Sequence, residues 1–215
     1  MVIAPRAFDA EVARRMASAM ECDALAVVPQ YYPAMITAQM HDPLPLRLRI
    51  ATMGAGMHAP ELVAAVRDVL GAEPILGYGQ TEAGNYIAYL RGEEQLRHPR
   101  ACGRPLPQFD VQVVDKHGKP VAPGIAGELC VRGPSVLSAY WRNPEATGEA
   151  LRGGWLHTGD IVAMDEFGLI TMMGRSKELI KTGGENVYPK EVEAVLFAWP
   201  IASCSAYRMI IGARP

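Results

Sequence analysis

Residues Gly174 to Glu193 read GRSKELIKTGGENVYPKEVE, and this stretch carries the strongest signal for the fold of the chain. This stretch follows an apolar segment typical of a strand, passes a Gly-Gly pair, and continues after Pro189 with a pattern that predicts a helix. Glycine adopts backbone angles that other residues resist, and proline suits the first turn of a helix. The sequence therefore predicts a pliable connector that carries Arg175, Lys177 and Lys181 at intervals.

The 215-residue chain is nearly neutral, with a formal charge of −2 and no acidic or basic block. This balance argues against a nucleic acid or an anionic membrane as the main partner. The first residues contain no basic region followed by an apolar run, and eighteen apolar residues in a row occur nowhere, so the expectation is a cytoplasmic protein without a membrane span. Cys22, Cys102, Cys130 and Cys204 form no CxxC pair, which predicts free, mostly buried thiols.

The first 85 residues alternate between helical and strand patterns. The expected elements are, in order, a helix over Phe8 to Met20 capped by Asp9, a strand over Ala24 to Val28, a helix over Pro33 to Met40, a strand over Leu46 to Thr52, a helix over Pro60 to Leu70 ended by Gly71, and a strand over Pro74 to Leu76. The alternation predicts an α/β fold with parallel βαβ units. Ligands of such sheets bind past the carboxyl ends of the strands, where the motif YGQTEAG (Tyr78 to Gly84) follows.

The residues of YGQTEAG suit a nucleotide. Gly77 and Gly79 keep the expected turn slim, so that its backbone can approach a phosphate, and Tyr78 offers an aromatic face to an adenine. Thr81 supplies a hydroxyl for a phosphate oxygen, and Glu82 supplies the hard carboxylate oxygen that Mg²⁺ prefers. Taken alone, the motif favours an ordinary glycine turn that carries a surface glutamate over a nucleotide site.

From Tyr86 onward, short strands and turns replace the alternation. Strands are expected at Val111 to Asp115, Glu128 to Arg132, Ile161 to Asp165 and Leu169 to Met173, with a turn at Asp165 to Gly168. The expected organisation of this part of the chain is an α/β part over residues 1–85 followed by a small β-rich part over 86–175.

The motif GWLHTGD (Gly154 to Asp160) offers a second ligand contact. One carboxylate can accept hydrogen bonds from both hydroxyls of a ribose, and Asp160 is the residue expected to do so. His157 in the same motif is interpreted as an orienting residue, because a lone histidine in a turn is more often structural than catalytic. Arg175 lies further along the chain and is a candidate for the same ribose or a phosphate.

Four motifs in order, YGQTEAG, GELCVRGPSVLSAYW, GWLHTGD and the connector, resemble those of the adenylate-forming (AMP-binding) superfamily, specifically its acyl-CoA synthetase branch. The resemblance covers about Val2 to Trp199. It implies the later part of a large AMP-binding domain over residues 1–175, then a hinge and the truncated start of an α+β C-terminal domain over residues 176–215. It further implies ATP, Mg²⁺, CoA and a small carboxylic acid as ligands, and it allows a homodimer in the complete enzyme.

The resemblance also assigns roles to individual residues, and in the family these roles belong to the matching motif positions. It implies catalytic roles for Thr81, Glu82 and Lys181, a metal contact for Glu82, nucleotide contacts for Tyr78, Gly79, Asp160 and Arg175, a hinge at Lys177, and a CoA channel at Gly183, Gly184 and Glu185.

The implied reaction has two steps. A carboxylate attacks the α-phosphorus of ATP to give an acyl-adenylate and pyrophosphate, and the thiol of CoA then displaces AMP. The GGENVYP segment is more similar to CoA ligases than to peptide-synthetase domains. An acyl-AMP ligase that loads a carrier protein is the alternative acceptor chemistry.

The chain lacks two parts that the resemblance leads us to expect, a glycine-rich phosphate loop before residue 1 and a lysine late in the C-terminal domain. We therefore expect a fragment with negligible adenylation activity of its own, or a nucleotide-binding remnant without turnover. The ending AYRMIIGARP departs from the family pattern, and this leads to the hypothesis of a frameshifted tail over residues 201–215.

The acid itself is not specified by the sequence. Residues near Tyr31, Gly54 to Met57, and Asn85 to Tyr86 flank strand ends beside the nucleotide motif, so they are expected to approach the acyl group. Their mostly small and apolar character permits an aliphatic or an aromatic acid.

Overall fold

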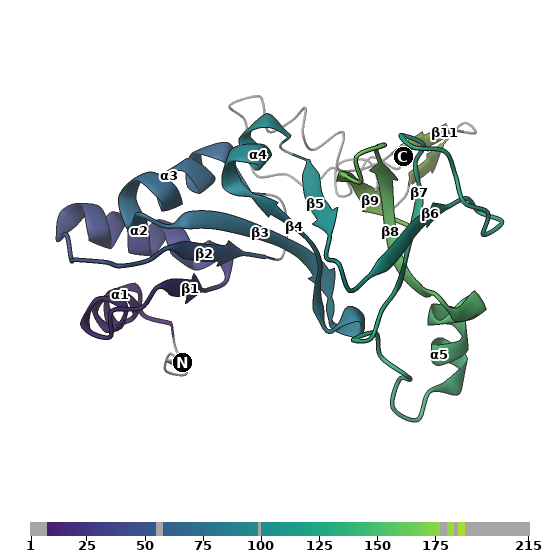
Figure 1. Cartoon of the computed structure of the whole chain (residues 1–215), viewed down its shortest axis with the longest axis horizontal. Coiled ribbons are helices and arrows are strands. Elements are labelled where there is room, and N and C mark those ends of the chain that lie inside the picture. Colours follow the sequence, from purple (N-terminus) through teal and green to yellow (C-terminus); the bar gives the residue numbers. More distant parts are fainter. Residues whose placement is uncertain (1–7, 55–57, 99, 177–179, 183–184, 188–215) are drawn as a thin grey trace, which may run out of the picture. The chain divides into compact units, whose positions relative to one another are not determined.

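The computed structural model describes residues 8–54, 58–98, 100–176, 180–182 and 185–187. The chain divides into two compact units, Met1–Leu106 and Pro107–Pro215 (Figure 1).

The first unit contains a mixed sheet with helices packed beside it. Its elements are α1 (Ala10–Ala19), β1 (Ala24–Ala26), η1 (Pro29–Tyr31), α2 (Tyr32–His41), β2 (Ile50–Met53), α3 (Pro60–Leu70), β3 (Glu73–Gln80), η2 (Thr81–Ala83), β4 (Asn85–Arg91), α4 (Gly92–Arg97) and β5 (Ala101–Pro105). Strands β1, β2 and β3 are parallel, whereas β4 and β5 continue the sheet antiparallel. Helix α3 packs on β3 and contacts α2 and α4 (Figure 1).

The parallel βαβ units are confirmed, and so are the local signals at the ends of two helices. The Asp9 carboxylate accepts hydrogen bonds from two backbone N–H groups of the first turn of α1, those of Glu11 and Val12. Helix α3 occupies the range that the sequence predicts, and Gly71 ends it in the left-handed conformation with φ +69°. The apolar faces form a core that includes Tyr32, Met35, Val63, Val66, Leu70, Ile87 and Leu90.

The expected turn at Gly77 to Gln80 is wrong, because these residues are the second half of strand β3. Strand β3 continues through the two glycines and pairs with β4, with Gly77 opposite Tyr89 and Gln80 opposite Asn85. The chain reverses only in η2 and Gly84, which has φ +77°. Strands β4 and β5 therefore extend the first unit past residue 85, where the sequence predicted the β-rich part to begin.

The second unit is an antiparallel sheet in the order β9-β8-β7-β6. Its elements are β6 (Asp110–Val114), β7 (Gly127–Arg132), α5 (Pro144–Ala150), η3 (Arg152–Gly154), β8 (Leu156–Met164), β9 (Ile170–Arg175), β10 (Ile180–Thr182) and β11 (Glu185–Val187). Its core contains Val113, Val114, Leu129, Val131, Leu156, Val162 and Ile170. Strand β8 begins before the expected Ile161 and includes the whole of HTGD, so Asp160 lies in a strand and not in a turn.

Part of the expected connector is a hairpin. Strands β10 and β11 pair antiparallel, with Lys181 opposite Asn186 and Thr182 opposite Glu185. Lys177, Gly183, Gly184, the expected helix after Pro189 and the proposed tail over 201–215 lie outside the described residues. Their expected roles remain predictions.

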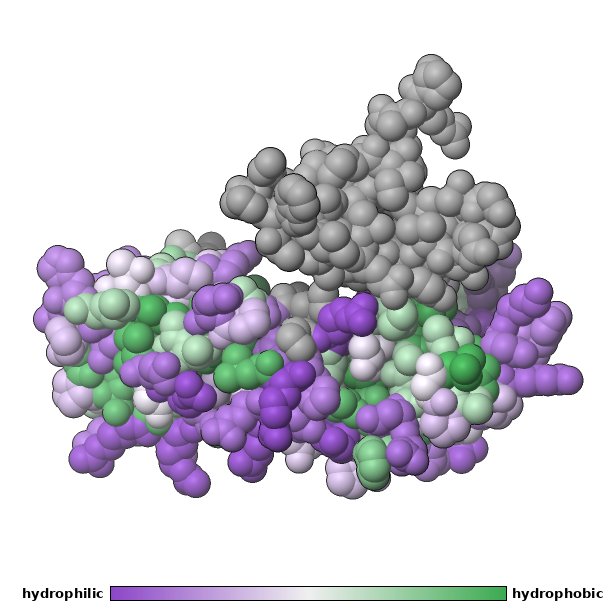
Figure 2. All heavy atoms as spheres, turned by 90° about the horizontal axis from the view of Figure 1, so that it is seen from above, coloured by the Kyte–Doolittle hydropathy of each residue, from purple (hydrophilic) through white to green (hydrophobic). Residues whose placement is uncertain are grey.

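Hydrophilic and hydrophobic side chains are interspersed on the described part of the face in Figure 2. Among the described residues, no helix combines the length and the apolar character that a membrane crossing requires.

Candidate functional site

The HTGD segment forms a bulge in the pairing of β7 with β8. Glu128 pairs with Ile161 and Cys130 pairs with His157, so the single residue Leu129 lies opposite the three residues 158–160. Gly159 has φ +72°, a backbone conformation that glycine adopts without the usual steric cost. Bulges bend a strand and change the direction of its side chains, and this one includes Asp160.

Hydrogen bonds fix the bulge on both sides. The Thr158 hydroxyl donates to the Leu129 carbonyl over 2.8 Å and accepts from the Asp160 N–H over 3.1 Å. The Gly159 carbonyl accepts from the Ser176 N–H over 2.9 Å. The backbone that carries Asp160 is therefore held from β7 and from the end of β9.

Asp160 and Arg175 are cross-strand neighbours in β8 and β9, and their charged groups meet. Arg175 Nε lies 3.0 Å from Asp160 Oδ1, and the side chains are 59% and 3% exposed, respectively. The Arg175 side chain is exposed enough to turn toward a ligand, and the buried Asp160 carboxylate would then need new hydrogen-bond donors, because an uncompensated buried charge is costly. The structure thus brings together Asp160, which is expected at a ribose, and Arg175, which is expected at the same ribose or a phosphate; both roles remain predictions.

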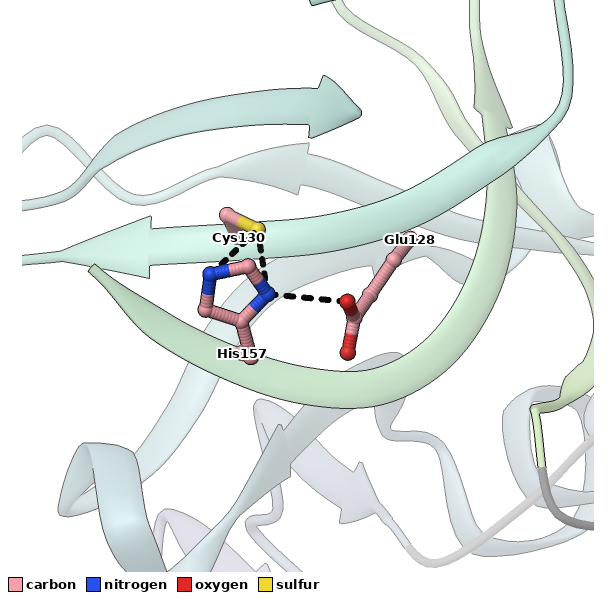
Figure 3. Close-up of side chains that lie close together, drawn as sticks. All are labelled: Glu128, Cys130 and His157. Carbon is pink, nitrogen blue, oxygen red and sulfur yellow. Dashed lines mark hydrogen bonds and ion pairs between the residues drawn. The ribbon is translucent and has the colours of Figure 1, made fainter. Parts of the chain in front are cut away.

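Glu128, Cys130 and His157 form a cluster behind the bulge, with their side chains facing one another from β7 and β8 (Figure 3). His157 Nδ1 lies 2.8 Å from Glu128 Oε2, and Cys130 Sγ lies 3.3 Å from the same nitrogen. Whether His157 orients the segment, as the sequence predicts, remains a prediction. The sequence motifs contain Glu128 and Thr158, but the pattern alone gave no reason to assign either residue a role.

Cys130 is expected to resist thiol reagents in the folded chain. Its side chain is buried, and burial together with the nearby Glu128 carboxylate raises the pKa of the thiol to about 12. Because the thiolate is the nucleophile, alkylation at pH 8 should modify the partly exposed Cys22 and Cys102 first and Cys130 only after unfolding. Mass spectrometry of the three peptides measures this, and equal labelling rates for Cys22 and Cys130 would contradict it.

The same shift of the thiol pKa predicts how the stability of the folded chain changes with pH. The folded-state pKa of Cys130 lies above the reference value of 9.0, so the unfolded chain releases the proton first as the pH rises. The contribution of this group to stability is complete below about pH 9 and is lost as the pH rises toward 12. The variant Cys130→Ala should show a smaller fall in stability over that interval.

The YGQTEAG motif spans the end of β3, the 3₁₀ turn η2 and Gly84 in the first unit. Tyr78 and Glu82 are partly exposed, and Gly79 and Thr81 are exposed. Thr81 and Glu82 lie together in η2, so a hydroxyl and a carboxylate are presented by one short turn. Asp160 and Arg175 belong to the second unit.

The packing of β4 against β3 requires the two glycines of β3, and the sequence did not show this requirement. A Cβ on Gly77 would lie 2.2 Å from the Tyr86 ring, and a Cβ on Gly79 would lie 1.7 Å from the Asn85 carbonyl oxygen. Neither glycine has a positive φ. Both are needed for the close approach of β4, and the slim phosphate-binding turn that we expected from them is not formed.

The comparisons with known proteins identify the class. The model of the family "AMP-binding enzyme" matches residues 1–141, and the chain belongs to this family. A 2-succinylbenzoate–CoA ligase from Geobacillus kaustophilus is 38% identical over 193 residues, which are 90% of this chain and 39% of that protein. A long-chain-fatty-acid–CoA ligase from Salmonella typhimurium is 42% identical over 144 residues, which are 66% of this chain and 26% of that protein.

Solved structures of this class have the same fold. The O-succinylbenzoate coenzyme A synthetase of Bacillus subtilis, in complex with ATP and magnesium, superposes with a TM-score of 0.81 at 27% identity over 91% of this chain and 40% of its own. The amide bond synthetase McbA from Marinactinospora thermotolerans gives a TM-score of 0.81 at 32% identity over 90% and 40%. The chain thus spans about 40% of the length of these relatives.

Proposed function

We propose that this chain contributes the nucleotide-contacting part of an enzyme that activates a small carboxylic acid with ATP and transfers the acyl group to CoA. The observation that carries the proposal is the buried Asp160 carboxylate, which is fixed by a bulge and lies beside an exposed arginine. The relatives are named CoA ligases, and a neighbouring structure contains ATP and magnesium.

In this proposal Asp160 accepts hydrogen bonds from the two ribose hydroxyls. A buried carboxylate with a fixed backbone loses little freedom on binding, and its charge strengthens each hydrogen bond. Arg175 moves from the carboxylate toward the ribose or a phosphate, which its 59% exposed side chain permits. This pair would orient the nucleotide for attack at the α-phosphorus.

Tyr78, Gly79, Thr81 and Glu82 supply the other nucleotide contacts in the proposal. Thr81 offers its hydroxyl to a phosphate oxygen, and Tyr78 offers its ring to the adenine. Glu82 is a suitable ligand for Mg²⁺, because its partly exposed carboxylate provides the oxygen donor that this ion prefers. The metal, when bound, would offset charge on the leaving pyrophosphate.

The second half-reaction is assigned to the connector. Lys181 and Glu185 lie in the paired strands β10 and β11, and we propose that Lys181 approaches the acyl-adenylate and that Glu185 lines the CoA channel with Gly183 and Gly184. Lys177 is the proposed hinge. The thiol of CoA attacks the acyl carbon, AMP leaves, and a thioester forms.

Tyr86 is proposed as a wall of the acyl pocket. Its ring covers Gly77, and its hydroxyl lies 3.1 Å from the position that a Cβ on Gly54 would take. It therefore fills the space beside two glycines, one directly after β2 and one in the middle of β3. A bulky ring at this position would shorten the space for the acyl chain.

Titration calorimetry of the chain with AMP, followed by an exchange assay, tests the proposal. We expect saturable AMP binding, and negligible carboxylate-dependent exchange of pyrophosphate into ATP by the chain alone. Absence of saturable binding at millimolar AMP would overturn the proposed nucleotide site in this chain. Exchange well above background would overturn only the expectation that the chain is inactive by itself.

A further inference from the structure

Glu128 is the acceptor on which the cluster behind the bulge converges. Its Oε2 lies 2.8 Å from His157 Nδ1 and 2.8 Å from Arg152 Nη2, and its Oε1 accepts the Gly159 N–H over 3.1 Å. The side chain is only 19% exposed, so these contacts are partly shielded from water. The nucleotide contacts proposed above make no use of this carboxylate.

The three donors come from places that determine the path of the bulge. Arg152 lies in η3 before β8. His157 is the residue directly before the bulge, and Gly159 is the bulge residue directly before Asp160. One carboxylate on β7 therefore fixes the chain at two points of HTGD and at the segment leading into it. A shift of Gly159 would be transmitted directly to the Asp160 carboxylate, because only one peptide bond separates them.

A metal site is the competing interpretation of this cluster. Glu128, Cys130 and His157 offer three ligand atoms within 4.8 Å of one another. The hydrogen-bonded interpretation fits better, because both oxygens of Glu128 already accept hydrogen bonds. In addition, Cys130 Sγ lies 3.3 Å and 3.8 Å from the two ring nitrogens, which flank a single carbon, so it is aligned with neither nitrogen.

We propose that Glu128 is a positioning residue that holds Gly159 and His157 so that the Asp160 carboxylate is set for the ribose hydroxyls. This inference rests on the proposed function, since the benefit of the placement is the sugar contact. The proposal predicts that loss of the Glu128 charge affects one part of the nucleotide. Recognition of the ribose should weaken, and contacts to the phosphate should stay in place.

The variant Glu128→Gln tests the inference, because it keeps the size of the side chain and removes its charge. AMP affinity should fall roughly tenfold, and the preference of the wild type for AMP over 3′-deoxy-AMP should largely disappear. Glu128→Asp keeps the charge on a shorter side chain, so this variant should retain part of the preference for AMP. Glu166→Gln, at an exposed position in the turn after β8, removes the same charge and should change neither quantity.

Two further measurements separate this inference from the proposed function. Amide hydrogen exchange without nucleotide should be faster at residues 157–160 in Glu128→Gln, and unchanged exchange there would overturn the inference even if the wild type bound no AMP. In the Asp160→Asn background, Glu128→Gln should have no additional effect on AMP affinity, because both changes act through one carboxylate. An unaltered sugar preference, or a cobalt(II)–thiolate absorption band that Cys130→Ser abolishes, would also overturn it.

Discussion

Replacing Asp160 with asparagine is expected to weaken AMP binding by this chain roughly 100-fold. The carboxylate is 3% exposed and presents two acceptor oxygens, whereas an amide presents one oxygen and carries no charge. The two charge-assisted hydrogen bonds accepted from the ribose would be replaced by weaker hydrogen bonds to a neutral amide. Calorimetric titration with AMP measures the loss.

The chain offers a matched control for this substitution. Asp110 and Arg132 are also cross-strand partners, with Arg132 Nη2 2.9 Å from Asp110 Oδ2, but the Asp110 side chain is 66% exposed and lies in β6. Asp110→Asn removes an equivalent ion pair and should leave AMP affinity unchanged. Equal affinities of the wild type and Asp160→Asn would remove Asp160 from the nucleotide site.

The elements that the sequence predicted well are those with signals inside one short segment. Helix α3 begins at a proline and ends at a glycine, and its apolar positions follow the helical period, so its range was predicted as observed. The same holds for the turn at Asp165, whose carboxylate accepts from the N–H groups of Phe167 and Leu169. The sequence assigned Asp160 to a ribose and Arg175 to the same ribose or a phosphate, but it did not predict the ion pair between them.

The elements that the sequence missed depend on a partner strand. Nothing in HTGD indicates that Leu129 lies opposite three residues, because a bulge is a property of two strands. The glycines of β3 were assigned to a turn, since the local pattern of small residues does not show that β4 returns along them. The role inferred for Glu128 has the same origin, because its three donors follow it by more than twenty positions.

Replacing Gly79 with alanine is expected to destabilise the first unit by about 3 kcal/mol. The added Cβ would lie 1.7 Å from the Asn85 carbonyl oxygen, and this neighbour is backbone, so β4 would have to move away from β3. Urea unfolding monitored by circular dichroism measures the loss. If Gly79 served only to admit a phosphate, alanine would weaken nucleotide binding and leave the free energy of unfolding unchanged.

Two other glycines make this prediction specific. Gly77→Ala should cost less than Gly79→Ala, because the added Cβ meets the Tyr86 ring, which can shift more easily than a carbonyl of the backbone. Gly148 lies inside α5, with no atom within 4 Å of an added Cβ and no positive φ, so Gly148→Ala should stabilise the chain by roughly 0.5 to 1 kcal/mol.

Because Thr81 and Glu82 follow directly after β3, a displaced β4 would also move the turn that carries them. We therefore expect Gly79 to affect both the packing of the sheet and the geometry of the proposed phosphate contacts. If Gly79→Ala unfolded with the free energy of the wild type, this expectation would be contradicted.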